Sequence, residues 1–146
     1  MPRKLFTAGY EGSTIGDFIS HLRKNNINCL VDVREVPFSR KPGFSKTKLA
    51  QRLSSARIHY LHLSELGAPK SLRENLKSTG DYSCFFKKMD RYLASKKDVI
   101  EEAYHYVMNS RCCLMCFEHL AARCHRTIVA EKIKARDGNG LQIKHI

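Results

Sequence analysis

The stretch LMCFEHLAARCHRTIVAE, residues 114–131, places two cysteines, two histidines and several charged side chains within the length of one strand and one helix. Cysteine and histidine bind zinc or act as a nucleophile and its base, whereas glutamate moves protons and arginine holds anions. The segment could therefore form a zinc centre, a nucleophile pocket or an anion-binding helix start. It could also be a buried strand followed by a charged helix.

A zinc centre would use Cys113 and Cys116, which have the two-residue spacing of a zinc knuckle, with Cys124 and His125 completing four ligands. In an extended strand, however, side chains at 113 and 116 point to opposite faces. Adjacent residues such as Cys124 and His125 also rarely bind the same ion. The sequence therefore predicts no metal site and no cofactor.

A nucleophilic cysteine is the second possibility. Cys116 at a strand end, followed by a helix with arginines, resembles the layout of cysteine-dependent phosphatases and sulfurtransferases, in which helix amides hold an oxyanion and lower the thiol pKa. The spacing from Cys116 to Arg123 is one residue longer than in C-x5-R phosphatases, and FEHLAAR contains no glycine. A thiol-dependent enzyme for a small anionic substrate, acting through Cys116 or Cys124, remains an alternative.

The third possibility is an anion-binding helix start. Arg123, His125 and Arg126 cluster where a helix is predicted to begin, and both the helix dipole and its free N–H groups favour negative charge there. Arginine adds a bidentate grip on phosphate or carboxylate. Pairing of these arginines with Glu118 or with solvent is the structural alternative.

Asp32 supplies a second carboxylate, at the end of the apolar run CLVDV, and Arg34 points to the same side of that strand. A buried aspartate is costly unless it is paired or functional. Together with Glu118 it offers the carboxylate pair that general acid–base or glycosidic chemistry requires. The alternative is that Asp32 caps a loop or bridges an arginine.

The loop VPFSRKPGFSKTK, residues 36–48, interleaves aromatic and basic side chains: Phe38, Arg40, Lys41, Phe44, Lys46 and Lys48. Aromatic rings stack on bases and cations contact the phosphate backbone, so the loop is a candidate nucleic-acid surface. Phenylalanines that plug the core from a loop are the alternative, because Phe is usually buried.

The charge balance also favours a polyanionic partner. The formal net charge is +12, and its excess lies in residues 1–60 and 111–146. Phosphate neutralisation dominates nucleic-acid affinity, so we expect nucleic acid, DNA rather than RNA, or a nucleotide-like anion as the partner. No apolar run is long enough to span a membrane, and we expect a cytoplasmic protein whose six cysteines are free thiols.

The elements that position these residues follow from hydrophobic periodicity. Strands are predicted at 3–8, 29–33, 58–63, 112–117 and 141–146, and helices at 14–22, 46–56, 82–95, 97–110 and 124–136, with 63–81 mostly irregular. Thr14 and Asp17 form a capping-box-like helix start. Alternating strands and helices over 146 residues predict one Rossmann-like α/β domain, a mostly parallel sheet flanked by helices.

In open parallel sheets, ligands bind at the carboxyl ends of the strands. We therefore expect the pocket there. The predicted catalytic residues are Glu118, Asp32 and Cys116, and the predicted substrate or anion contacts are Gly9, Tyr10, Arg34, Arg40, His62, Cys124, His125 and Arg126.

The motifs TAGYEG, VDVREVPFSR, HLSELG and LMCFEHLAARCHR resemble those of the DUF488 family of small α/β proteins, from Thr7 to the end of the chain. The resemblance implicates Gly9, Tyr10, Asp32, Arg34, Pro37, Arg40, His62, Leu66, Gly67, Cys116, Glu118, Cys124, His125 and Arg126. Tyr10 and Glu11 depart from the pattern, since members often have a histidine and a serine there. Because the family is defined by sequence, the resemblance bears on fold and site rather than on reaction.

These observations favour a nucleic-acid-interacting enzyme, such as a DNA-repair-type hydrolase of N-glycosidic bonds. Glu118, with Asp32, would activate water, while Arg34, His125 and Arg126 would hold phosphate. A binding module without activity, in which the CHR segment is structural, is the alternative from another class.

Overall fold

The computed structural model describes residues 3–146 and contains a sheet in which every strand pairing is parallel. The strands are β1 (Lys4–Gly9), β2 (Cys29–Asp32), β3 (His59–His62), β4 (Cys112–Cys116) and β5 (Gln142–His145), in the order β3-β2-β4-β1-β5. The predicted α/β fold with a mostly parallel sheet is thus confirmed, and in the described residues no strand runs antiparallel.

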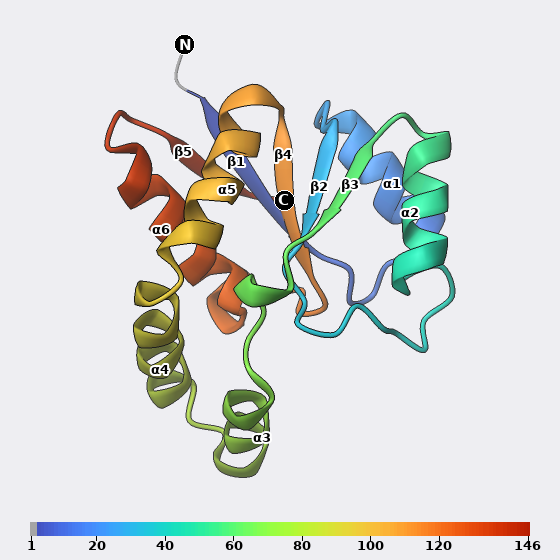
Figure 1. Ribbon diagram of the computed structural model, residues 1–146. Coiled ribbons are helices and arrows are strands. Elements are labelled where there is room, and N and C mark those ends of the chain that lie inside the picture. The colour runs from blue at the N-terminus through green and yellow to red at the C-terminus, as the bar shows by residue number, and fades with distance from the viewer. Residues whose placement is uncertain (1–2) are drawn as a thin grey trace.

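The helices are α1 (Ile15–Lys24), α2 (Lys46–Ser55), α3 (Lys70–Thr79), α4 (Tyr82–Ala94), α5 (Lys97–Asn109) and α6 (His125–Asp137), with 3-10 turns at Ser64–Leu66 and Ala121–Arg123. Helices α1 and α2 cover one face of the sheet, α5 and α6 cover the other, and α4 continues that second layer beyond the sheet (Figure 1). None of the described helices is both long and apolar enough to cross a membrane.

Strand β4 shows why the sequences of the central strands β2 and β4 are nearly continuous runs of apolar residues. Leu114 and Cys116 belong to the core under α4, α5 and α6, whereas Cys113 and Met115 belong to the core under α1 and α2. All five side chains of this strand are buried. A strand covered on both faces has no solvent side, so its sequence cannot alternate between apolar and polar residues.

Helix α3 corrects the prediction that residues 63–81 are mostly irregular. It has ten residues, buries none of them fully, and touches the core only through the partly buried Leu72 and Leu76. It ends at Gly80, whose φ of 67° places it in the left-handed region. Two apolar positions are too few to produce a helical period, so the helix was not visible in the sequence.

The start of α1 was predicted from local signals and is confirmed. The side chain of Thr14 accepts a hydrogen bond from the amide of Asp17, at 3.1 Å. Phe18, Ile19 and Leu22 are the buried positions of this helix. A capping side chain and an apolar stripe are both readable within a single turn or two of chain, which explains the success.

Candidate functional site

A pocket of about 420 Å³ opens at the carboxyl ends of the central strands. Its lining comes from the ends of β1, β2 and β4, from α3 and α4, and from the start of α6. Among the residues singled out in the sequence it contains Tyr10, Arg34, Phe38, Cys116, Glu118, Cys124 and His125. Segments more than a hundred residues apart therefore meet at one edge of the sheet.

Asp32 does not face this pocket. It is completely buried, and its carboxylate accepts hydrogen bonds from Arg34 Nε at 2.9 Å, Arg34 Nη2 at 2.7 Å and the Tyr60 hydroxyl at 2.6 Å. The Arg34 amide donates to it as well, at 3.1 Å. The structure therefore realises the alternative in which Asp32 bridges an arginine, and this argues against Asp32 as a catalytic base.

The ion pair with Asp32 also fixes the Arg34 guanidinium in place. Burial on its own lowers the pKa of the guanidinium, but the hydrogen bond to Asp32 and the charge of Asp32 outweigh it and raise that pKa above its ordinary value. The remaining nitrogen, Nη1, donates to the Tyr10 hydroxyl at 3.2 Å. Arg34 lines the pocket, and Asp32 and Tyr10 take three of its five N–H donors, which leaves two for a phosphate.

Tyr10 and Phe44 belong to the core. Both are almost fully buried, and their rings stack with centroids 4.3 Å apart. The prediction that Phe44 lies on a nucleic-acid surface is therefore wrong, because the ring plugs the core from its loop. Lys41 is also drawn inward, since its Nζ donates to the Tyr10 carbonyl at 3.1 Å.

The Arg126 side chain is enclosed by protein groups and connects several segments of the site. It is 1% exposed, and its guanidinium donates to Thr7 Oγ1, Cys116 Sγ and the carbonyls of Glu118 and His119. Desolvation lowers its pKa. The prediction that Arg126 grips phosphate fails because these protein partners enclose it, and its effect is to hold the loop after β4 against α6.

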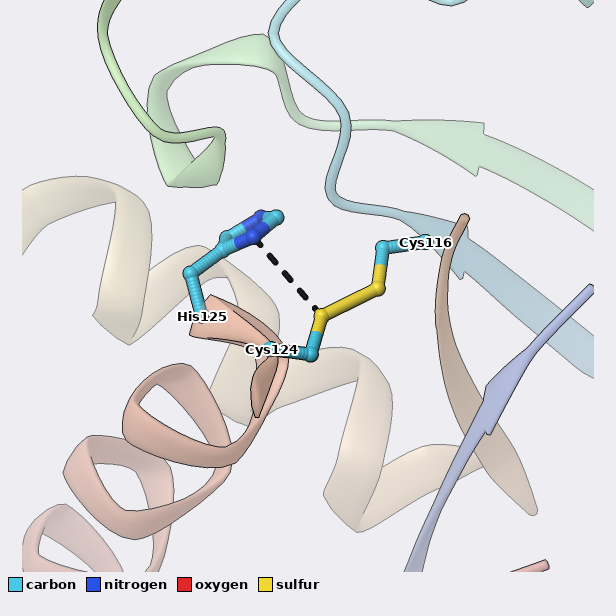
Figure 2. A group of neighbouring side chains, drawn as sticks. All are labelled: Cys116, Cys124 and His125. Carbon is cyan, nitrogen blue, oxygen red and sulfur yellow. Dashed lines mark hydrogen bonds between the residues drawn. A yellow bond between two sulfur atoms is a disulfide. The ribbon is translucent and has the colours of Figure 1, made fainter. Parts of the chain in front are cut away.

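The two pocket cysteines form a disulfide, Cys116–Cys124, across the gap between β4 and α6 (Figure 2). For this pair the prediction of free thiols is wrong, whereas Cys29, Cys84, Cys112 and Cys113 are free. Strand pairing places Cys116 beside Gly9, while the intervening turn returns the chain to Cys124. Local spacing alone could not reveal this meeting.

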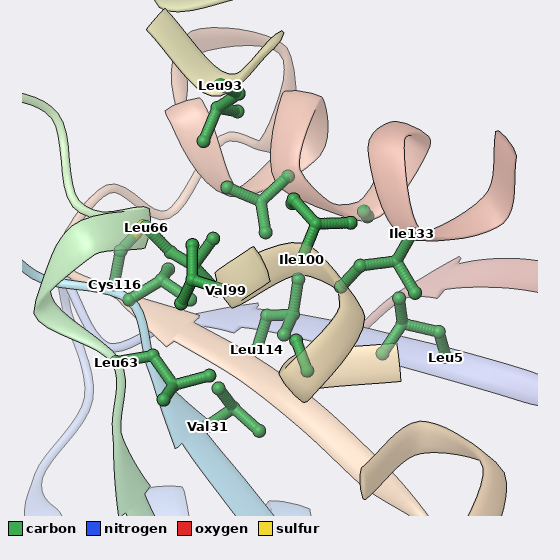
Figure 3. Packing of buried hydrophobic residues seen from close by; sticks show 14 of the residues in the cluster. Leu5, Val31, Leu63, Leu66, Leu93, Val99, Ile100, Leu114, Cys116 and Ile133 are labelled. Carbon is green, nitrogen blue, oxygen red and sulfur yellow. The ribbon is translucent and has the colours of Figure 1, made fainter. Parts of the chain in front are cut away.

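Cys124 begins α6. Its backbone is extended, and its sulfur accepts a hydrogen bond from the amide of Arg126 at 3.4 Å, in the way a capping side chain does. Cys116 in turn is 3% exposed and belongs to the larger core, which also contains Leu66 and Val99 (Figure 3). Both cysteines are thus almost fully buried, and both line the pocket.

His125 points at the sulfurs from the first turn of α6 (Figure 2). Its Nε2 lies 2.7 Å from the Val33 carbonyl, which can only accept, so Nε2 carries a hydrogen. Nδ1 lies 3.8 Å from Cys124 Sγ. Desolvation lowers the pKa of His125, which favours the neutral ring with a free lone pair on Nδ1.

Glu118 lines the pocket and is half-buried. Its backbone carbonyl accepts from Arg126, but within residues 3–146 its carboxylate has no hydrogen-bond or ion-pair partner. The other pocket carboxylate, Glu35, pairs with Arg73 at 2.6 Å. Glu118 is therefore the lining carboxylate left available for chemistry.

Gly9 contributes space rather than a contact group. A Cβ built on Gly9 would lie 1.8 Å from the Glu118 carbonyl oxygen and 2.9 Å from the His119 Cα. Only glycine lets β1 approach the loop after β4 so closely. Gly9 therefore allows close packing of two backbone segments, whereas the sequence predicted a substrate contact.

The pocket mouth carries exposed apolar side chains. Val36, Phe38 and Phe117 line it and are 58%, 67% and 49% exposed, and Leu120, in the loop after β4, is 50% exposed. These are the large hydrophobic residues that the described chain leaves in solvent. Exposed apolar patches mark binding sites more often than isolated apolar residues do.

The other predicted residues lie around the pocket. His62 Nε2 is 2.7 Å from the Arg34 carbonyl, so His62 supports the loop after β2. Arg40, Lys46 and Lys48 line a separate basic hollow of about 460 Å³, which shares Ser39 with the pocket.

Sequence reasoning missed several contributors: Thr7, Tyr60, Arg73 and Phe117. Thr7 interrupts the buried strand β1, and a polar residue there was an available signal. Tyr60 lies on β3, which is only partly buried, so its position gave no such signal. Arg73 lies on α3, which the sequence did not reveal. Phe117 reads as the end of a buried strand, but it lies beyond β4 and turns outward.

A family model described as "Domain of unknown function DUF488" matches residues 14–133. No curated protein and no solved structure matches the chain. The matched range contains β2, β3 and β4, the first nine residues of α6, and the disulfide and imidazole of the pocket. Because the match covers most of the sequence, the protein belongs to the DUF488 family.

Proposed function

We propose that this protein is a hydrolase that acts on a nucleobase-bearing substrate in nucleic acid, with Glu118 as the general base. The observation that carries the proposal is the unpaired Glu118 carboxylate in a pocket whose mouth presents two exposed aromatic rings. A base needs a free carboxylate within reach of water, and an extruded nucleobase needs apolar faces on which to stack.

The surroundings support a nucleic-acid substrate. Phe38 and Phe117 stand at the mouth, and the basic hollow with Arg40, Lys46 and Lys48 adjoins it through Ser39. The chain has a formal net charge of +12. Cations next to stacking rings suit a strand whose phosphates run past the pocket while one base enters it.

The reaction we propose is hydrolysis of an N-glycosidic bond. Water attacks the sugar carbon, the carbon–nitrogen bond breaks, and its electron pair leaves with the base. Glu118 accepts a proton from the attacking water, and that proton then passes to the departing base or to solvent. The products are the free base and an abasic sugar, which together contain the atoms of substrate and water.

Exchange of Glu118 for Gln tests this assignment. We expect product formation to fall on the order of 100-fold or more, because the amide cannot accept the proton. Binding should change little, since the side chain keeps its size. The assay is base release from labelled single-stranded, duplex and base-damaged DNA, and from RNA, at several salt concentrations, with binding measured by titration of the same strands.

Glu74→Gln is the matched control, because Glu74 is an exposed carboxylate on α3 that pairs with the also exposed Lys70, and it should behave like wild type. Equal loss of binding and turnover in Glu118→Gln would contradict a catalytic role. Absence of product from every substrate would remove the hydrolase assignment, and binding alone would then favour a module without activity.

Phe38→Ala tests the stacking role. Because Phe38 is 67% exposed, its removal should change the free energy of unfolding by no more than about 0.5 kcal/mol. If a base stacks on it, binding of single strands should weaken by about 1–3 kcal/mol. The salt dependence of binding should stay unchanged, since the ring carries no charge, and unaltered affinity would exclude Phe38 from the interface.

Thiol–disulfide exchange is a second candidate, favoured by the Cys116–Cys124 disulfide in the pocket wall. The reduced pair would pass two electrons and two protons to a substrate disulfide, giving a dithiol and the protein disulfide, and a small cellular dithiol would restore the thiols. Cys124→Ser should abolish reduction of a disulfide substrate, whereas Cys84→Ser should not. Equal rates in both variants would exclude this candidate.

A further inference from the structure

We infer that Cys116, Cys124 and His125, once the disulfide is reduced, form a three-ligand site for a zinc-class divalent ion that opens into the pocket. Binding of the ion does not depend on the hydrolysis proposed above. It requires only that both cysteines be thiols and that His125 offer Nδ1.

The ligand atoms already lie close together. One atom from each of the three side chains, Sγ of both cysteines and a ring nitrogen of His125, falls within 4.8 Å of the others. Zinc bonds of about 2.3 Å to sulfur and about 2.0–2.1 Å to nitrogen imply ligand separations of roughly 3.5–3.8 Å around a tetrahedral ion. The observed distance from Cys124 Sγ to His125 Nδ1 is 3.8 Å.

Each ligand is also oriented by a second hydrogen bond. His125 donates Nε2–H to the Val33 carbonyl, which leaves Nδ1 as the ligand atom. The Arg126 amide donates to Cys124 Sγ, and Arg126 Nη1 donates to Cys116 Sγ at 3.3 Å. Backbone carbonyls on a ligand histidine and N–H donors on ligand sulfurs are supports that protein metal sites use.

The charges agree with a divalent ion. Two thiolates would balance the ion, and they are the soft and borderline donors that select zinc over magnesium or calcium. The buried Arg126 guanidinium adds a positive charge, which the negative charge of the Glu118 carboxylate partly offsets. Without an ion, the two neighbouring thiolates would repel each other.

The disulfide and the ion exclude each other. Formation of the disulfide removes two protons and two electrons from the thiols and leaves no thiolate to bind metal. The Cα atoms of Cys116 and Cys124 are 7.7 Å apart. Once the bond is reduced, this spacing leaves room for two separated sulfurs with an ion between them.

The sequence predicted no metal for two reasons. Adjacent residues such as Cys124 and His125 rarely bind the same ion, yet in the structure Cys124 Sγ and His125 Nδ1 lie 3.8 Å apart. The other reason was the orientation of Cys113, the partner of Cys116 in the two-residue spacing. That residue lies in the core under α1 and α2, on the other face of the sheet from Cys116. The ligand set proposed here omits Cys113 and has three members. Three protein ligands leave one position for water, which is the arrangement of catalytic rather than structural zinc sites.

The test uses the full chain reduced with a phosphine and titrated with Co²⁺ in the absence of oxygen. We expect one Co²⁺ per chain, with the near-ultraviolet sulfur-to-cobalt charge-transfer absorption that thiolate ligands produce, and Zn²⁺ should displace it. Cys116→Ser and Cys124→Ser should each bind on the order of 100-fold more weakly or not at all. Cys84→Ser is the matched control and should bind like wild type.

A measurement on the wild-type protein covers the case in which a ligand variant does not fold. With Zn²⁺ bound, the thiols of Cys116 and Cys124 should be protected from alkylation, whereas Cys84, which is partly exposed, should still react. Peptide mass spectrometry separates these sites.

Several outcomes would overturn the inference. They are absence of the charge-transfer band in the reduced protein, equal cobalt binding by either ligand variant, or equal binding by the oxidised protein. Glu118→Gln should keep its cobalt affinity, because Glu118 is not a ligand. Loss of turnover in that variant and loss of metal in the cysteine variants are therefore separate results.

Discussion

Replacement of Asp32 by Ala is expected to lower the free energy of unfolding by about 3–5 kcal/mol. The change leaves the nearly buried Arg34 guanidinium without its carboxylate partner. It also removes the acceptor of the Tyr60 hydroxyl. A buried charge that loses its counter-charge retains the full cost of desolvation. Chemical denaturation followed by circular dichroism measures the effect.

The control for this prediction is Glu74→Ala, which also removes the carboxylate of an ion pair. Lys70 and Glu74 are 77% and 67% exposed, so water replaces the lost interaction and the change should stay within about 0.5 kcal/mol. If Asp32→Ala cost no more than this control, the pair would not be held in the interior as described. Tyr60→Phe, which removes one hydrogen bond to Asp32, should cost about 1 kcal/mol.

Replacement of Gly9 by Ala is expected to cost about 3 kcal/mol of stability, the upper part of the usual range for overpacking. The added Cβ would meet the Glu118 carbonyl oxygen at 1.8 Å and the carbonyl carbon at 2.5 Å. Both obstacles are backbone atoms, so no side chain can rotate away. The loop that carries Glu118 must move, and substrate and Co²⁺ binding should weaken together with the fall in thermal stability.

Gly16→Ala is the matched control for Gly9→Ala. Gly16 lies in α1, and a Cβ there meets nothing within 4 Å. Alanine should therefore leave the stability unchanged or raise it by up to about 1 kcal/mol, because it restricts the unfolded chain and favours the helix. Similar destabilisation by both substitutions would show that the close contact at Gly9 is not the cause.

Much of the fold could be predicted from the sequence because its signals are local. The apolar run of β2 indicated a strand buried on both faces, the run of β4 indicated a further strand, and the Thr14 cap marked the start of α1. Alternation of strands and helices then indicated a parallel sheet, and a parallel sheet gathers the strand ends at one edge. The neighbourhood of Tyr10, Cys116 and Glu118 followed from that rule without any knowledge of their contacts.

What each side chain does at that edge was decided by tertiary structure alone. The sequence could not show whether an arginine is free or enclosed, because that depends on partners far along the chain, as with Thr7 and Arg126. It could not show that Cys116 and Cys124 lie side by side either, because that depends on the turn before α6, which brings the chain back to the end of β4. Periodicity records which face of an element is apolar, whereas hydrogen bonds, ligand sets and close backbone approaches arise only when elements pack.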